Sequence, residues 1–250
     1  MDNFKNSIAT APLTGRGTNR IGGSDMDNGI KLPSLLDHTL LKAEASEKDL
    51  ISMCDEAKKF GFATVAVNSA NVRFVADQLK GSASGVCAAV GFPFGATCTS
   101  IKIAETGLAI EDGATDVDMV INIGALKSGK RDLVAEEIGR FAAAARDKAL
   151  SKIILETCLL TEEEKIWVCE CCAEKGVDFV KTSTGLQSGG ATLEDIKLMK
   201  KTVGDRCRVK ASGGIKSLDQ ALAFIEAGAT RLGSSASVAI AEEWLARRGK

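Results

Sequence analysis

The chain is predicted to be an α/β protein that folds as one closed (β/α)8 barrel, and two observations predict it. From residue 32 onward, short apolar runs rich in β-branched residues alternate with longer amphipathic stretches, the pattern of repeated βα units around a parallel sheet. The 250 residues carry eight such runs without an internal linker, which suits a single barrel. The alternative, an open Rossmann-like sheet, would want a Gly-x-Gly-x-x-Gly motif after the first run, and none stands there.

Each predicted element has a local reason. The helices have recognisable starts at Ser46, Thr161, Thr192 and Ser217, where a hydroxyl can cap the first turn and acidic residues follow. The expected strands are residues 35–37, 64–67, 86–90, 116–121, 152–156, 179–181, 208–211 and 231–233.

Residues 1–31 contain few large apolar side chains and show no periodicity, so they are predicted to be a flexible tail ahead of a barrel domain at 32–250. Arg16 and Arg20 leave a transit peptide open as an alternative. Acidic residues, which such peptides avoid, occur at Asp2, Asp25 and Asp27.

Composition excludes several classes of function. The formal net charge is −1, aromatic residues make up 4% and tyrosine is absent, so nucleic-acid binding is not expected. No long apolar segment suggests a membrane span. The eight cysteines are spread through expected strands and helices, which indicates a reducing, cytoplasmic setting. Cys169 and Cys172 have the spacing of a redox or metal pair, but their place inside a helix favours packing.

Polar residues at strand ends carry the most functional weight, because the carboxyl ends of barrel strands form the active-site face. This criterion selects Asp37, Asn68, Asp118, Asn122, Glu156, Lys181 and Lys210.

Lys181 and Lys210 end two neighbouring strands, and this pairing indicates amine chemistry. An ordinary lysine has a pKa near 10.4, so only on the order of one in a few thousand is a free amine at neutral pH. A nearby second ammonium and burial both favour the free amine, which can then attack a carbonyl and form a Schiff base. The residues alone do not show which lysine is the nucleophile.

Asp118 lies inside an apolar run, where a carboxylate needs a partner. It is either a general acid/base paired with the two lysines or a purely structural ion pair. Asp116 is expected on the opposite face of the same strand.

Two glycine-rich turns, at 211–215 and 233–237, follow the last two strands and open onto helices. Barrels commonly bind phosphate there through backbone amides and helix N-termini. The single histidine, His38, makes a metal-dependent mechanism improbable and is more typical of a structural group, so no metal and no cofactor are expected.

Taken together, these motifs resemble the 2-deoxyribose-5-phosphate aldolase family, over about residues 32–242. The motifs that carry the resemblance are residues 36–42 (LDHTLLK), 117–120 (VDMV), 180–185 (VKTSTG), 209–215 (VKASGGI) and 231–235 (RLGSS). The resemblance implies a metal-free class I aldolase that reversibly cleaves 2-deoxy-D-ribose 5-phosphate to D-glyceraldehyde 3-phosphate and acetaldehyde. A homodimer or homotetramer is expected.

The resemblance also assigns roles. It makes Lys181 the Schiff-base residue and Lys210 the neighbour that lowers its pKa, with Asp118 and Lys210 moving protons through a water molecule. The residues expected to arrange the substrate and bind its phosphate are Asp37, Thr39, Thr184, Gly213, Gly214, Lys216, Gly233, Ser234 and Ser235.

The chain departs from the family pattern at several positions. Ala66 and Ser69 replace a Cys and a Pro that many relatives carry, Ala236 replaces a serine, and no tyrosine is present to assist proton transfer. Two other functions stay open: a sugar-phosphate isomerase or synthase with Glu156 as base, and a non-catalytic barrel that binds sugar phosphates.

Overall fold

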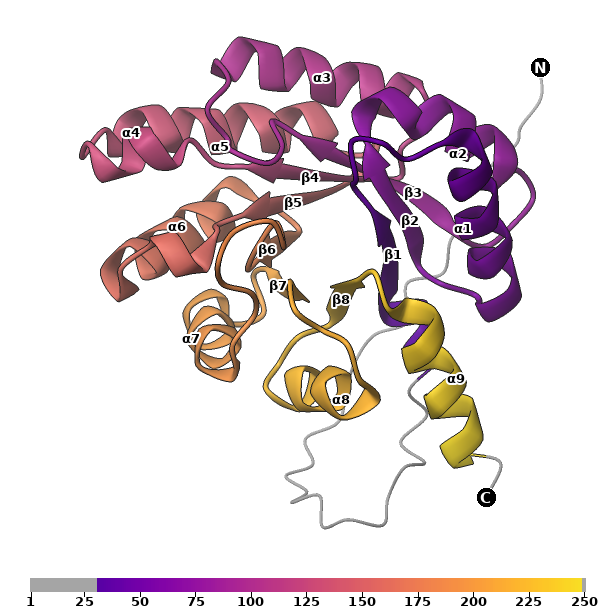
Figure 1. Ribbon diagram of the computed structural model, residues 1–250. Coiled ribbons are helices and arrows are strands. Elements are labelled where there is room, and N and C mark those ends of the chain that lie inside the picture. Colours follow the sequence, from indigo (N-terminus) through magenta and orange to yellow (C-terminus); the bar gives the residue numbers. More distant parts are fainter. Residues whose placement is uncertain (1–30, 249–250) are drawn as a thin grey trace, which may run out of the picture. The chain divides into compact units, whose positions relative to one another are not determined.

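The computed structural model describes residues 31–248, and in this part of the chain eight parallel strands close into a barrel in sequence order (Figure 1). The strands are β1 (Leu36–Leu40), β2 (Thr64–Asn68), β3 (Gly85–Val90), β4 (Asp116–Val120), β5 (Leu150–Ile154), β6 (Phe179–Lys181), β7 (Arg208–Ser212) and β8 (Arg231–Ser234). All eight predicted strands and the predicted barrel are confirmed. The largest differences lie at the ends of β1, which continues to Leu40, and of β5, which stops before Glu156.

Helices surround the barrel and connect its strands (Figure 1). The α-helices are α1 (Glu47–Phe60), α2 (Val72–Gln78), α3 (Thr99–Glu111), α4 (Ile123–Lys127), α5 (Arg131–Ala145), α6 (Glu162–Lys175), α7 (Leu193–Val203), α8 (Leu218–Glu226) and α9 (Ser237–Arg248). Short 3₁₀ helices are η1 (Leu32–Leu35), η2 (Ser69–Asn71) and η3 (Thr157–Leu159).

The predicted helix starts are confirmed by their caps. The hydroxyls of Ser46 and Thr161 each accept a hydrogen bond from the backbone amide three residues later. The acidic side chain at that later position accepts a hydrogen bond from the backbone amide of the serine or threonine, which completes a capping box. Thr192 and Ser217 cap α7 and α8 in the simpler way, through their hydroxyls.

The barrel wall is apolar on its outer side and carries charged side chains on its inner side. Because side chains alternate along a strand, Val117 and Met119 of β4 join the buried apolar core, while Asp116 and Asp118 share the other face. The same alternation separates Val180 from Lys181 on β6 and Val209 from Lys210 on β7. The barrel interior can therefore hold charged chemistry while the outer layer stabilises the fold.

The predicted tail, apart from Lys31, lies outside the described residues, as does the transit-peptide alternative, so the domain division at residue 32 stays a prediction. Among the described residues, no helix combines the length and apolar character that crossing a membrane requires.

Candidate active site

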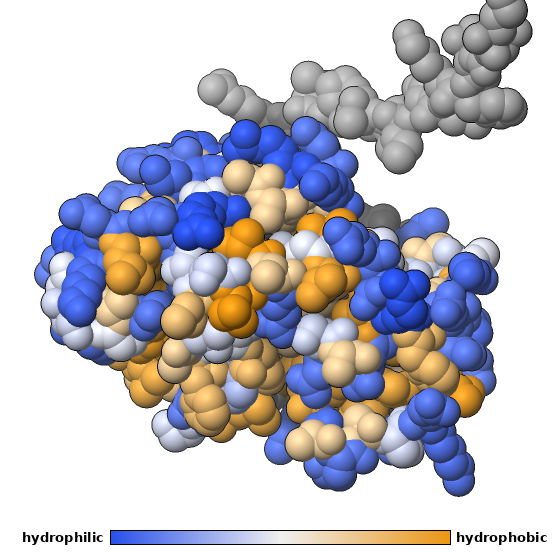
Figure 2. All heavy atoms as spheres, turned by 90° about the horizontal axis from the view of Figure 1, so that it is seen from above, coloured by the Kyte–Doolittle hydropathy of each residue, from blue (hydrophilic) through white to orange (hydrophobic). Residues whose placement is uncertain are grey.

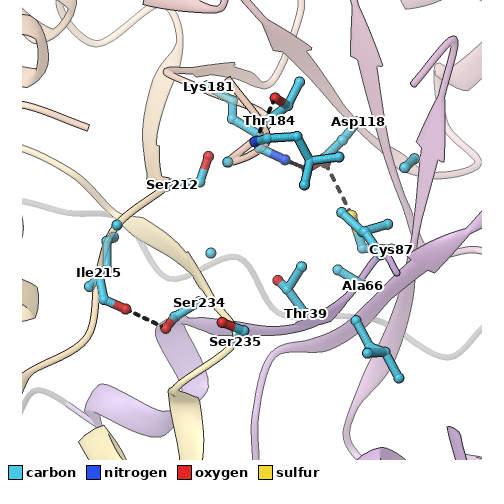
Figure 3. A pocket seen from close by; sticks show the side chains of 18 of the residues that line it. Thr39, Ala66, Cys87, Asp118, Lys181, Thr184, Ser212, Ile215, Ser234 and Ser235 are labelled. Carbon is cyan, nitrogen blue, oxygen red and sulfur yellow. Dashed lines mark hydrogen bonds and ion pairs between the residues drawn. The ribbon is translucent and has the colours of Figure 1, made fainter. Parts of the chain in front are cut away.

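A cavity of about 270 Å³ opens at the carboxyl ends of the strands (Figure 3). The predicted site residues that line it are Thr39, Asp118, Lys181, Thr184, Gly213, Gly214, Lys216, Gly233, Ser234 and Ser235. This is the end of the barrel at which active sites of this fold are found. Figure 3 shows two distinct sides: Ser234, Ser235 and Ile215 lie on one, and Cys87 and Ala66 lie on the other.

Asp118 is the centre of the polar contacts on the cavity floor. One of its carboxylate oxygens, Oδ2, accepts hydrogen bonds from Lys181 Nζ at 2.9 Å and from Lys210 Nζ at 2.7 Å. The other oxygen, Oδ1, lies 3.0 Å from Lys152 Nζ and accepts a bond from the Cys87 thiol at 3.1 Å. The structure thus brings the two lysines selected from the sequence to one atom of the selected carboxylate.

The expectation that Asp116 lies on the opposite face of β4 is wrong. Residues two apart on a strand share a face, so Asp116 points inward with Asp118, and both contact Lys152, whose Nζ lies 2.5 Å from Asp116 Oδ2.

Lys152 was missed by the sequence reasoning, although it is completely buried and its place on β5 is directly opposite Asp118 on β4. A signal was present, since Lys152 interrupts an apolar strand just as Asp118 does. Arg231, at the start of β8, was also missed, and its Nη1 lies 2.8 Å from Asp37 Oδ1.

These side chains form a connected group that we call the buried charge cluster. It comprises Asp37, Asp116, Asp118, Lys152, Lys181, Lys210 and Arg231. The cluster contains three carboxylates and four basic groups, and the most exposed of its side chains, Arg231, is 12% accessible. The carboxylates are matched in number without Lys181, so a proton on Lys181 adds an uncompensated buried charge.

The pKa values follow this count. Burial lowers the pKa of Lys181 and the Lys210 ammonium lowers it further, against the opposing attraction of Asp118. Burial alone would also lower the pKa of Lys210, but Asp118 and Asp37 outweigh it and raise that pKa above its usual value. Lys210 therefore stays charged while Lys181 is shifted toward the free amine.

Asp118 is held as a carboxylate by the same neighbours. Burial raises its pKa, but Lys152, Lys181 and Lys210 together hold that pKa well below its usual value. Burial raises the pKa of the Cys87 thiol, so Cys87 acts as a neutral hydrogen-bond donor to Asp118.

The other end of the cavity is formed by the two glycine turns. Gly214 has a positive φ of 79°, and Gly233 lies so close to Lys210 that an added Cβ would come within 3.2 Å of Lys210 Cε. Ser234 donates its hydroxyl hydrogen to the Ile215 carbonyl, whereas Ser235 is exposed to the cavity. The turns lead into the N-termini of α8 and α9, which favour an anion.

Several selected residues lie away from the cavity surface. Asp37 and Lys210 lie beneath it, with Lys210 Nζ 2.5 Å from Asp37 Oδ2. Glu156 is fully buried, and Asn122 caps α4. His38 contacts Glu56 at 2.7 Å on the outer side of β1, consistent with a structural role.

Asp37, Cys87 and Asp118 are close enough together to hold a metal ion in principle, with ligand atoms within 4.8 Å of one another. Their surroundings do not fit one. Lys210 already bridges the two carboxylates, at 2.5 and 2.7 Å, and its ammonium would repel a cation. All eight cysteines are free thiols, and Cys169 and Cys172 are buried in α6, as their packing interpretation predicts.

Comparison with known proteins places the chain in a family. Residues 33–240 match the model of the DeoC/LacD family aldolases. The deoxyribose-phosphate aldolases of Carboxydothermus hydrogenoformans and Streptococcus sanguinis are 53% and 55% identical to it, over 86% and 84% of this chain and 96% of each relative. The tetrameric deoxyribose phosphate aldolase of Aeropyrum pernix superposes with a TM-score of 0.80 at 28% identity, covering 88% of this chain and 94% of that one. The chain belongs to the DeoC/LacD family of aldolases.

Proposed function

We propose that this protein is a class I aldolase that reversibly cleaves 2-deoxy-D-ribose 5-phosphate to D-glyceraldehyde 3-phosphate and acetaldehyde, with Lys181 as the Schiff-base residue. The observation that carries the proposal is the placement of Lys181 Nζ on the cavity floor, 2.9 Å from Asp118, in a cluster whose charges balance without its proton. A lysine in that setting is a nucleophile at a pH where ordinary lysines are not.

The reaction begins when the free amine of Lys181 attacks C1 of the open-chain sugar to form a carbinolamine, which loses water to give an iminium. Asp118, acting through a water molecule, then takes the proton of the C3 hydroxyl, the C3 oxygen forms a carbonyl, the C2–C3 bond breaks, and the electron pair of that bond flows into the iminium. Glyceraldehyde 3-phosphate leaves and an enamine remains on Lys181. Asp118 and Lys210, 2.7 Å apart, relay protons through a water molecule, first to C2 of the enamine and then for hydrolysis.

The substrate phosphate is proposed to bind at the glycine turns. Backbone amides of Gly213, Gly214 and Gly233 and the N-termini of α8 and α9 favour an anion there. Ser235 lines the cavity and can donate its hydroxyl hydrogen to the phosphate, and Lys216, which also lines the cavity, can supply a positive charge. The sugar then runs from Lys181 toward β7 and β8.

The alternative with Glu156 as a catalytic base has little geometric support. Glu156 is fully buried, it does not line the cavity, and its carboxylate is occupied by Thr184. A non-catalytic sugar-phosphate-binding barrel would need the glycine turns but not a balanced cluster around Lys181.

Borohydride trapping tests the proposal directly. Reduction in the presence of acetaldehyde should add a two-carbon group to the peptide that contains Lys181, and a coupled assay should detect glyceraldehyde 3-phosphate from the sugar phosphate. Lys216→Met, which removes an exposed lysine from the cavity rim, is the control and should still be labelled at Lys181. Absence of the Lys181 adduct in wild type would show that the Schiff-base assignment is wrong.

We further propose that the protein acts in the cytoplasm and assembles into a homo-oligomer. The tetrameric relative supports assembly, and so do Phe94, Ile101 and Leu108, which are 67%, 56% and 62% exposed on α3 and the loop before it. Figure 2 views the face over which α3 lies and shows orange, apolar patches among the blue ones. Light scattering on the purified protein tests the proposed assembly, and a mass equal to that of one chain would contradict it.

A further inference from the structure

Glu156 combines three features that the reaction proposed above does not use. It is a carboxylate with no exposed surface, its backbone adopts a left-handed conformation with φ of 58°, and it stands two residues beyond the end of β5. Among the described residues, only Asp147 shares a positive φ without being glycine. Burial and a backbone of this kind are both costly for glutamate, so the surrounding contacts must hold it in place.

The hydrogen bonds of the Glu156 side chain all go to the loop that follows the proposed nucleophile. The Glu156 carboxylate accepts a hydrogen bond from Thr184 Oγ1 at 2.5 Å and from the Thr184 backbone amide at 3.2 Å. Thr184 Oγ1 in turn accepts a bond from the Leu186 amide at 3.2 Å. The Thr184 hydroxyl hydrogen is thus engaged by Glu156, although Thr184 was expected to face the substrate.

The backbone on both sides of Glu156 is hydrogen-bonded to the end of β6 and to the residue that follows it. The Leu155 amide donates to the Lys181 carbonyl at 2.9 Å, and the Thr157 amide donates to the Thr182 carbonyl at 3.0 Å. The left-handed turn at Glu156 therefore sits between two backbone hydrogen bonds that join the segment after β5 to Lys181 and Thr182, and its side chain reaches the loop that follows Lys181. Figure 3 shows Thr184 and Lys181 on the same side of the cavity.

The far side of the loop is fixed to β7. Ser212 Oγ donates to the Ser183 carbonyl at 2.5 Å, and Thr182 Oγ1 donates to the Ser212 carbonyl at 3.0 Å. Ser212 directly precedes the Gly213 turn. Glu156 is thus the β5 anchor of a loop whose other anchor leads to the proposed phosphate site.

We infer that Glu156 is a positioning residue for the aldolase reaction: through Thr184 it fixes the loop after Lys181, so that the amine and the cavity wall at Thr184 and Gly185 keep the geometry that imine formation requires. This inference rests on the proposed function. Small displacements of a nucleophile lower the rate of attack strongly, so an anchor that never touches the substrate can still control turnover.

The test compares Glu156→Gly with Asp147→Gly. Glycine accepts the left-handed backbone at both positions, so neither change introduces strain, but only the first removes the anchor. Asp147 is exposed in the turn before β5, at the opposite end of the barrel, and serves as the matched control. We expect Glu156→Gly to lower kcat at least 10-fold and to slow borohydride trapping of acetaldehyde, with a smaller change in KM. Asp147→Gly should stay within 2-fold of wild type.

Two further variants separate positioning from stability. Glu156→Gln keeps an acceptor oxygen for Thr184 and should recover part of the lost rate. Thr184→Val removes the hydroxyl partner, and adding it to Glu156→Gly should cause little further loss, because both changes break the same link. Thermal melts identify the folded fraction for each variant.

The outcomes are distinguishable. If wild type forms no Lys181 adduct, the proposed function fails. If wild type is active and folded Glu156→Gly turns over at the wild-type rate, the positioning role is wrong and Glu156 serves stability alone. If folded Glu156→Gly is slow but Glu156→Gln is no better, positioning through Thr184 is wrong.

Discussion

Replacing Lys210 with methionine tests the electrostatic origin of the reactive amine. The Nζ atoms of Lys181 and Lys210 both lie on Asp118 Oδ2, at 2.9 and 2.7 Å, so they are at most 5.6 Å apart, the sum of the two distances. At an effective dielectric constant of about 20, two like charges at that separation repel by about 3 kcal/mol. Removing the Lys210 charge therefore raises the pKa of Lys181.

The expected consequence is about a 100-fold smaller fraction of free amine at any pH below the pKa of Lys181, because about 1.4 kcal/mol corresponds to a factor of ten. The assay is the rate of borohydride trapping with acetaldehyde, followed across pH, since it reports imine formation without the later proton transfers. The acid limb of that rate should move to higher pH in Lys210→Met, and raising the pH should restore trapping.

Lys216→Met is the matched control because it removes the same charge from an exposed position at the cavity. Its trapping profile should coincide with that of wild type, since exposed charges are screened. A folded Lys210→Met protein whose acid limb coincides with wild type would refute the argument that Lys210 lowers the pKa of Lys181.

Further predictions concern other parts of the site. Lys181→Met should abolish both adduct formation and release of glyceraldehyde 3-phosphate, as shown by mass spectrometry and the coupled assay. Lys152→Met should lower the free energy of unfolding by about 3–5 kcal/mol in denaturant titrations, because it leaves two buried carboxylates short of a partner; unchanged stability would contradict this. Ser235→Ala should raise KM about 10-fold for the sugar phosphate, from the loss of one hydrogen bond to a charged group, but leave KM for unphosphorylated 2-deoxyribose unchanged. Burial raises the pKa of Asp37, but the attraction of Lys210, Lys152 and Arg231 outweighs burial, so the pKa is lower in the folded protein than in the unfolded chain. The stability that the Asp37 carboxylate contributes is therefore present above the unfolded-state pKa of about 3.9 and is lost as the pH falls below that value. Acid titrations of Asp37→Asn should lack this part of the loss of stability.

The fold was predictable because its determinants are local. Ser46 and Thr161 mark the starts of helices because their hydroxyls can cap the first turn. Eight apolar runs that alternate with helical stretches are compatible with few topologies other than a barrel. The strand ends were less accurate. Glu156 was placed inside β5, but its left-handed backbone ends the strand at Ile154, a conformation that side-chain pattern does not encode.

The site was predictable where a charge interrupts an apolar strand and a motif supports it, as for Asp118, Lys181 and Lys210. Lys152 and Arg231 were missed because their roles depend on cross-strand register: Lys152 faces Asp118 only when β5 pairs with β4 as observed, and Arg231 reaches Asp37 only when β8 closes the barrel on β1. The register between adjacent strands, which decides which of their residues lie side by side, could not be inferred from this single sequence.

The charge balance of the buried cluster also bears on the bond that breaks. In the proposed reaction, the iminium on Lys181 carries a positive charge beyond those that match the three carboxylates of the cluster, which Lys152, Lys210 and Arg231 already pair. Carbon–carbon cleavage turns that iminium into a neutral enamine, and the barrel interior returns to balance once the proton released from the C3 hydroxyl has left the cavity. The electrostatics that favour a free amine in the resting enzyme therefore also lower the energy of the enamine relative to the iminium, so one arrangement of charges assists both the attack on the sugar and its cleavage.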